Sequence, residues 1–455
     1  MPVDSKHPDY GLKLAAWAKL RDCAVGMEAV KAKGEDYLPM PSGFAAQQDR
    51  GAAMYAAYSA RAQFPEIFNP TISGMVGMIH RREAEIKMPA ALQGIWERAT
   101  KDGLPLEAFH RKITTELLEV GRFGILADAL PEEAGGSLLP YLAGYTAEAI
   151  FNWSAARDLF VLSEKDRTRT DEFTWADVQR YRVLRLSNGV YTQQVYTGED
   201  AGALVTPARR GGGGTLDAIP FVVVGARDTN LDPDDPPLLG VADAALAIFR
   251  LDADYRHQLF MSGQETLCII GADDNPSAVG AGVVIGIPLG GDAKYVGPTC
   301  NGISAHRTAI ADERANAATA GAKVADASKG GVESGEALRI RNVSRTATMV
   351  TVALSSAQGL EQALRHAATM IGANPAEVVV TPNLEFVDQL LDPKSAGELV
   401  KLWQGGAISY PTLYENLQRG GIASSERSAD EEKGLIDAED PLPAPVPPVP
   451  PGAAE

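Results

Sequence analysis

Pro236 to Ser262 reads PPLLGVADAALAIFRLDADYRHQLFMS, and these residues have the pattern of one long amphipathic helix. Two prolines open it at a position where the missing N–H of a first helical turn does no harm. Apolar residues such as Leu246 and Phe249 recur on one side, and charged residues on the other. The spacing predicts one helix from Leu238 to Ser262, about 37 Å long at ~1.5 Å per residue.

The residues after this helix lack a core of their own. Residues 264–304 contain short strands between glycine and proline turns. A second helix is expected at 305–327, a glycine-rich loop at 328–335, and a long helix at 336–376 that a β-branched stretch weakens. These roughly 40 residues lie between two helices and cannot form a hydrophobic core of their own. We therefore expect neighbouring subunits to cover them. Helices placed side by side in a ring would form a tube with a polar lumen, lined by Asp243, Arg250 and Asp254.

The flanking regions differ in character. Residues 1–235 contain helices first and antiparallel strands after, which predicts an α+β class, with His80 and His110 on helix surfaces. Residues 377–422 contain a short strand and two short helices. Residues 423–455 are acidic from Ala429 and then proline-rich, a composition typical of an extended, disordered tail.

Composition limits the class of protein. The chain has 455 residues, 45% of them hydrophobic, and a formal net charge of −17. This charge disfavours a dedicated nucleic-acid binder, because DNA affinity comes mainly from Lys and Arg. It is compatible with a wall that encloses DNA without gripping it. Three widely spaced cysteines (Cys23, Cys268 and Cys300) indicate synthesis in a reducing cytoplasm, and no apolar run is long enough to span a membrane.

Motifs for catalysis are missing from the sequence. It has neither a phosphate-binding G-x-x-x-x-G-K-[ST] loop nor an H-E-x-x-H metal motif, and no G-x-S-x-G elbow. We therefore expect no catalytic, cofactor or metal site. The alternative is an enzyme with an unrecognised site, such as a hydrolase that uses His257, His306 or His366.

A series of short motifs follows a fixed order along the chain. The motifs are Gly34-Glu-Asp-Tyr-Leu-Pro39, Tyr55-x-x-Tyr-x-x-Arg61-Ala62-x-Phe64, Gly121-Arg122-Phe-Gly-Ile-Leu, Tyr145-x-Ala-Glu148-x-Ile150-x-Asn152-Trp153, Ile219-Pro220-Phe221, Pro236-Pro237-Leu-Leu and Ser334-Gly335-x-Ala337-Leu338. Each motif alone is weak. In their order and spacing over residues 8–422, the motifs resemble the portal proteins of tailed bacteriophages, in particular a subgroup catalogued as a domain of unknown function.

The resemblance implies the portal fold, with wing, stem, clip and crown regions. The regions would be a wing at 1–235, a first stem helix at 236–263, a clip at 264–304, a second stem helix at 305–327, a tunnel loop at 328–335, a long wing helix at 336–376, a crown at 377–422 and the tail at 423–455. The DNA-facing tunnel loop would consist of Ser328, Lys329, Gly330, Gly331, Val332, Glu333, Ser334 and Gly335.

The resemblance also implies the function and the partners. The chain would form a homo-dodecameric ring at one capsid vertex of the virion, the channel for genome packaging and ejection. Its partners would be the terminase large subunit, a head–tail adaptor, the major capsid protein and scaffold, and double-stranded DNA passing through without sequence specificity. No membrane partner and no cofactor are implied. Another ring protein of the head–tail junction is the runner-up.

Overall fold

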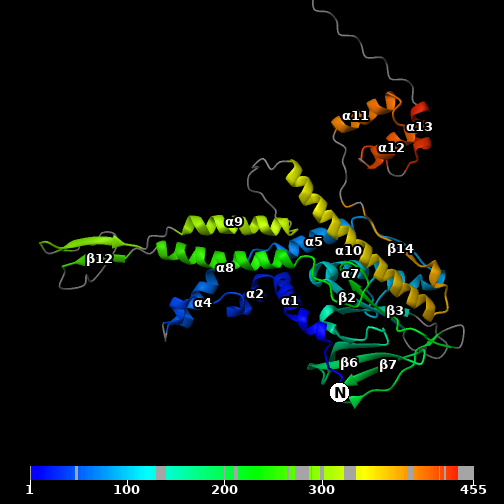
Figure 1. Ribbon diagram of the computed structural model, residues 1–455, viewed down its shortest axis with the longest axis horizontal. Coiled ribbons are helices and arrows are strands. Elements are labelled where there is room, and N and C mark those ends of the chain that lie inside the picture. Colours follow the sequence, from blue (N-terminus) through cyan, green and yellow to red (C-terminus); the bar gives the residue numbers. More distant parts are fainter. Residues whose placement is uncertain are drawn as a thin grey trace, which may run out of the picture. The chain divides into compact units, whose positions relative to one another are not determined.

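A computed structural model describes residues 2–46, 50–129, 140–198, 200–209, 214–263, 266–271, 286–287, 289–297, 302–321, 335–384, 386, 393–419, 421–424 and 427–438, with the backbone alone at some of them, including 335–346. The chain divides into two units, Met1–Leu384 and Glu385–Glu455. Helices come first along the chain, antiparallel strands follow from β2 to β11, and long helices return after them, a segregated order typical of the α+β class (Figure 1). No described helix is long and apolar enough to cross a membrane.

The first unit begins with short helices that surround α8 (Leu239–Ser262) and α7 (Leu106–Val120). Buried residues of α1, such as Trp17 and Leu20, recur at helical spacing and pack inward. The elements of this region are α1 (Pro8–Val25), α2 (Met27–Ala32), η1 (Gly34–Asp36), α3 (Ser42–Ala45), α4 (Gly51–Arg61), α5 (Phe68–Ile79), η2 (Ala90–Leu92) and α6 (Gly94–Glu97).

A three-stranded antiparallel sheet forms the centre of this unit, in the order β11-β2-β3. Its strands are β2 (Arg122–Ala129), β3 (Pro140–Thr146) and β11 (Phe221–Gly225). All five residues of β11 are buried, as expected of a strand covered on both faces. Helices α7 and α10 (Gly335–Met370) pack against this sheet (Figure 1).

A second antiparallel sheet has the order β4-β5-β6-β7-β8. Its strands are β4 (Ile150–Trp153), β5 (Leu159–Arg169), β6 (Trp175–Ser187), β7 (Val190–Thr197) and β8 (Asp200–Ala201), and a two-residue turn at Asn188 and Gly189 joins β6 to β7. Both turn residues have positive φ, as a two-residue hairpin loop requires and as Asn and Gly readily adopt. Beyond this sheet, β9 (Ala208–Arg209) pairs with β10 (Gly214–Thr215).

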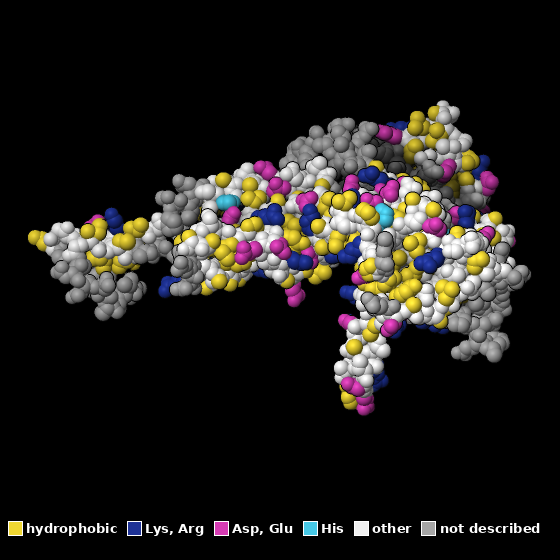
Figure 2. All heavy atoms as spheres, turned by 60° about the horizontal axis from the view of Figure 1, so that its bottom comes forward, with side chains coloured by type: hydrophobic (Ala, Val, Ile, Leu, Met, Phe, Trp, Pro, Cys, Tyr) yellow, Lys and Arg dark blue, Asp and Glu magenta, His cyan; other side chains and the backbone are white. Residues whose placement is uncertain are grey.

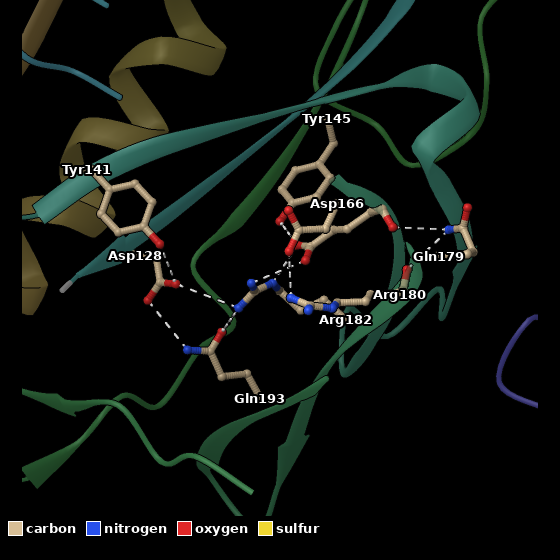
Figure 3. A network of polar contacts seen from close by, with 9 residues as sticks. Asp128, Tyr141, Tyr145, Asp166, Gln179, Arg180, Arg182 and Gln193 are labelled. Carbon is tan, nitrogen blue, oxygen red and sulfur yellow. Dashed lines mark hydrogen bonds and ion pairs between the residues drawn. The ribbon is translucent and has the colours of Figure 1, made fainter. Parts of the chain in front are cut away.

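A polar network joins the two sheets (Figure 3). Arg182 of β6 forms an ion pair with Glu164 of β5 at 2.6 Å and donates a hydrogen bond to Gln193 of β7 at 3.1 Å. Tyr145 of β3 donates to the same Glu164 carboxylate at 2.6 Å. Asp128 of β2 accepts a 3.1 Å hydrogen bond from Tyr141 of β3. Because each charged group has a partner, this network fixes the position of the second sheet on the first.

A second charged cluster attaches α1 to the centre of the unit. The Arg21 guanidinium contacts three carboxylates, Glu116 at 2.6 Å, Glu119 at 2.9 Å and Glu148 at 2.8 Å. The first two lie on α7, and Glu148 lies on η3 (Ala147–Ala149). Burial alone would lower the pKa of Arg21. Its hydrogen bonds to Glu148 and Glu116 outweigh burial and raise the pKa above its usual value, so Arg21 stays charged.

Two long-range features complete the first unit. Helix α10 runs without interruption through its β-branched stretch, and η4 (Pro375–Glu377) follows it. Strand β14 (Val379–Thr381) then pairs with β1 (Glu85–Lys87), almost 300 residues earlier in the chain. The sequence predicts a strand at 377–381, and its partner β1 was not predicted.

The second unit contains three short helices, α11 (Pro393–Gln404), α12 (Tyr410–Arg419) and α13 (Ala429–Ala438). The first two were predicted. The third corrects the expectation that the chain is extended from Ala429 onwards. Ser428 and Glu431 form a capping box, in which the Ser428 N–H donates to the Glu431 carboxylate and the Glu431 N–H donates to Ser428 Oγ. Acidic residues in the first turn also favour the helix N-terminus. Residues 439–455 lie outside the described residues.

Candidate functional site

Helices α8 and α9 (Ile303–Thr319) lie antiparallel and form a two-helix arm (Figure 1). At one end, Gly240 of α8 approaches Ala320, whose Cβ would lie 3.1 Å from a Cβ on the glycine. At the other end, Gln258 Nε2 and His306 Nε2 form a 2.9 Å hydrogen bond. A close approach of two small residues at one end and a hydrogen bond at the other therefore hold the two helices side by side. The predicted helix–insertion–helix pattern is present, with α9 described only as far as Thr319.

The N-terminal helices hold the opposite side of α8. Tyr58 donates a 2.6 Å hydrogen bond to Asp254, and the backbone N–H of Gln63 donates to Asp252 at 2.8 Å. The guanidinium of Arg61 lies over the Phe260 ring at 4.2 Å. Two residues of the Tyr55-x-x-Tyr-x-x-Arg61 motif thus hold α8 against the N-terminal helices.

The three residues expected in a channel lumen are exposed on α8, and each has a partner in the N-terminal helices. Asp243 pairs with Lys19, Arg250 donates to the Tyr37 carbonyl at 2.8 Å, and Asp254 accepts from Tyr58. The sequence identified them as polar. It did not reveal these partners, because they lie about 190 residues or more earlier in the chain.

An exposed β-hairpin follows the end of α8. Strands β12 (Thr266–Ile270) and β13 (Asp292–Val296) pair only with each other among the described residues. We give the name distal apolar surface to five of the exposed apolar side chains of this region, between 41% and 61% exposed: Leu259, Met261, Ile270, Tyr295 and Val296. Hydrophobic side chains gather at this end of the arm in Figure 2, and acidic and basic side chains alternate along the arm itself.

Most of the expected tunnel loop lies outside the described residues, including Lys329. Its last expected residue, Gly335, is the first residue of α10. The expected second stem helix ends at Ala327, and its residues from 322 onwards also lie outside the described part of the chain.

The three histidines of the enzyme alternative have separate environments. His257 lies 3.3 Å from the Arg61 guanidinium. Burial, and to a lesser extent the positive charge of Arg61, lowers the pKa of His257. His306 contacts Gln258, and burial lowers the pKa of His366 on α10. Within the described residues no group of three His, Cys, Asp or Glu side chains could hold a metal ion. This arrangement gives a hydrolytic site no support.

His110 is buried and His80 is half-buried, against the expectation that both lie on helix surfaces. His80 Nε2 bonds Thr114 Oγ1 at 2.8 Å, His110 Nε2 bonds Ser356 Oγ of α10 at 3.2 Å, and the two rings meet edge to face at 4.8 Å. The sequence does contain a signal for the burial of His110. Its spacing from Leu106 and Ile113 places His110 on the buried face of α7. Burial lowers the pKa of His80 to about 4 and that of His110 to about 3.

We expect this histidine pair to make stability depend on pH. Because the folded pKa values lie below the unfolded value of about 6.5, the unfolded chain binds more protons as pH falls. Their contribution is complete above pH ~6.5 and is lost as pH falls towards 4 and 3, at up to about 1.4 kcal/mol per pH unit for each histidine. Denaturant unfolding at several pH values should show a shallower slope for His110→Gln. The control Thr114→Val removes no titrating group and should keep the slope, and an unchanged slope in His110→Gln would contradict the assignment.

A shallow groove lies beside this pair, along the outer side of α7. One part has a volume of about 370 Å³ and is lined by Asn69, Ser73, His80 and Arg111 among others. The adjoining part, about 520 Å³, shares Arg111 and Thr115 and continues to Glu107 and Lys112. The groove is open and is lined by side chains of both charges. Its described lining residues do not form the arrangement of nucleophile and base that catalysis requires.

One family model matches the two-helix arm together with the long helix that follows it. This model, described as a domain of unknown function (DUF4055), matches residues 237–371, from the start of α8 to the end of α10. No curated protein matches the chain.

Three solved structures similar to this chain come from gene transfer agent particles. The neck of an empty particle, computed with C6 symmetry, shares 13% identity at a TM-score of 0.40, covering 83% of this chain and 95% of the other. The neck of a native particle, computed with C12 symmetry, shares 14% identity at a TM-score of 0.39, covering 78% and 89%. The virion of the native particle shares 14% identity at a TM-score of 0.40, covering 83% and 95%.

Proposed function

We propose that this chain is the portal subunit of a tailed phage or phage-like particle. Twelve copies would form a ring at one capsid vertex, and the ring would be the channel for genome packaging and ejection. The observation that carries the proposal is the distal apolar surface at the end of the two-helix arm. The ordered portal motifs of the sequence support it independently.

The arm supports a ring because its hairpin, in a single copy, has strand edges that are unpaired among the described residues and apolar side chains that are exposed. A two-stranded hairpin is marginally stable alone, and both outer edges of β12–β13 present unpaired backbone groups among the described residues. Side chains such as Tyr295, 61% exposed, add apolar area beside those edges. In a ring, each hairpin would lie against its neighbours, so that both edges and the apolar side chains become covered.

The channel would run past the polar residues of α8. Asp243, Arg250 and Asp254 are exposed, and we propose that they face the lumen while their partners on the N-terminal helices hold them in place. The acidic balance of the chain fits a wall along which DNA slides without binding tightly. The tunnel loop at 328–335 would make the closest approach to DNA.

The remaining regions would take the roles that the portal resemblance implies. Residues 264–304 would be the clip that binds the terminase large subunit during packaging and a head–tail adaptor afterwards. The wing at 1–235 would face the major capsid protein and scaffold, and residues 377–422 would be the crown.

We expect Tyr295→Asp to abolish assembly of the ring and leave the monomer folded. A carboxylate on the distal apolar surface would have to be desolvated in each of the subunit contacts. Sedimentation of the purified protein should show monomers where the unaltered chain forms a large species, with unchanged circular dichroism. The matched control is Phe173→Asp, which places the same charge at an exposed aromatic position on the β5–β6 hairpin. Normal rings in Tyr295→Asp, or equal loss in both variants, would contradict this role of the hairpin.

We expect Lys329→Glu to impair DNA packaging and leave the ring intact. Lys329 is the only basic residue of the expected tunnel loop, and the change adds a repulsive charge towards DNA in each copy. An in vitro packaging assay with purified terminase would measure the loss, and Ser328→Thr serves as the charge-neutral control. Packaging at the unaltered rate by Lys329→Glu rings would exclude a DNA-contacting role for this residue.

A further inference from the structure

Three aromatic rings gather on helices α11 and α12 of the second unit. Trp403 and Tyr410 meet edge to face with their centroids 5.8 Å apart. Tyr410 and Tyr414 are nearly parallel, at 6.2 Å and an interplanar angle of 23°. Tyr414 is buried, whereas Trp403 is 39% exposed. These residues form an aromatic row (Trp403, Tyr410 and Tyr414) that is open to solvent at its tryptophan end.

This unit buries little of its own apolar surface. Within residues 393–419, 421–424 and 427–438, the buried hydrophobic side chains are Leu413 and Tyr414. Leu402 and Trp403 remain exposed. A helical unit of this size with so small a core is marginally stable alone, so a segment that covers the aromatic row would stabilise it.

The chain itself contains a segment of the right chemistry. Residues 439–455 read EDPLPAPVPPVPPGAAE, with seven prolines and no charge between Pro441 and Pro451. Proline-rich segments favour the polyproline II helix, which has no internal hydrogen bonds and loses little entropy on binding. Grooves lined by aromatic rings are the usual docking site of such helices, because the rings pack against the proline rings.

We propose that residues 441–451 dock on the aromatic row of the same chain as a polyproline II helix. The segment begins three residues after α13, which packs against α12, the helix that carries Tyr410 and Tyr414. The eleven residues 441–451 would span about 34 Å as a polyproline II helix, more than the length of about 15 Å of the ten-residue helix α12. Tethering at this distance gives the segment an effective concentration of about a millimolar, so weak intrinsic affinity suffices.

The test compares the full chain with a chain that ends at Ala438. A fluorescent peptide of residues 439–455 is titrated into both proteins, and its anisotropy is measured. We expect saturable binding to the shortened chain and at least tenfold weaker binding to the full chain, whose own tail occupies the site. A peptide with alanine in place of all seven prolines should not bind, because it loses the extended preference.

Variants of the shortened chain locate the site. Trp403→Ala should abolish peptide binding, whereas Trp96→Ala, which removes a tryptophan of similar exposure (43%) from α6, should preserve it. If Trp403→Ala also loses helix content by circular dichroism, the comparison of full and shortened chains remains decisive because it alters no residue of the site. Absence of peptide binding to the shortened chain, equal binding to both chains, or equal binding of the proline-free peptide would each overturn the proposal. Competition that appears only at concentrations where the full chain assembles would assign the tail to a neighbouring copy and overturn docking within one chain.

Discussion

Replacing Arg21 by methionine is expected to lower the free energy of unfolding at pH 7 by about 3 kcal/mol, the lower end of the cost of removing one partner of a buried ion pair. The substitution leaves Glu116, Glu119 and Glu148 close together without a cation. Methionine preserves most of the apolar contact of the arginine stem, so the loss reports the charge. Denaturant unfolding of the two proteins at pH 7 measures it.

The size of this loss should depend on pH. Burial alone would raise the pKa of Glu148, but its hydrogen bond and ion pair with Arg21 outweigh burial and lower it. The stability that this carboxylate contributes is present above its unfolded pKa and is lost as pH falls through the folded value. In Arg21→Met, acidification protonates the clustered glutamates and removes their repulsion. The difference between the two proteins should therefore shrink from pH 7 towards pH 4.

A matched control separates this cluster from an ordinary surface pair. Arg111 pairs with Glu107 at 2.6 Å, and both side chains are exposed. Arg111→Met should cost less than about 0.5 kcal/mol, as exposed pairs of this spacing do. Equal losses in the two variants, or a pH-independent loss in Arg21→Met, would show that the Arg21 cluster does not attach α1 to α7.

Gly359→Ala should destabilise the chain by about 1–3 kcal/mol, because it overfills the contact between α10 and β11. A Cβ at Gly359 would lie 2.3 Å from Val224 Cγ2, and Val224 is completely buried. The methyl group therefore pushes α10 away from the central sheet. Thermal or denaturant unfolding measures the loss.

The control for this prediction has the opposite sign. Gly77 lies in α5, and a Cβ there would meet no atom within 4 Å. Gly77→Ala should stabilise the chain by about 0.5–1 kcal/mol, because alanine loses less conformational entropy in a helix. A stabilising effect of Gly359→Ala would contradict the close packing of α10 on the sheet.

Local pattern predicted much of the fold. The helix at 238–262 follows from one apolar stripe and two opening prolines, and it is observed at Leu239–Ser262. The strands that flank Asn188 and Gly189 follow from turn residues that accept positive φ. Signals of this kind act within one or two turns of chain, so they can be read without knowing the tertiary contacts.

Long-range contacts escaped prediction for the same physical reason. The partner of Asp254 is Tyr58, and β1 pairs with β14 across almost the whole first unit. Neither pair has a local signature, since each depends on how the elements pack. The helix α13 was missed because overall acidity was weighed above the capping box of Ser428 and Glu431.

In the proposed assembly, copies of this chain form a ring around a channel, with the two-helix arms side by side. Cryo-electron microscopy of the purified full chain would image this assembly. We expect closed rings, twelvefold in the particle, with a central hole bordered by α8 and with adjacent β12–β13 hairpins in contact at one end. A stable monomer under all assembly conditions, or a ring in which the hairpins point outwards without contacting one another, would contradict it.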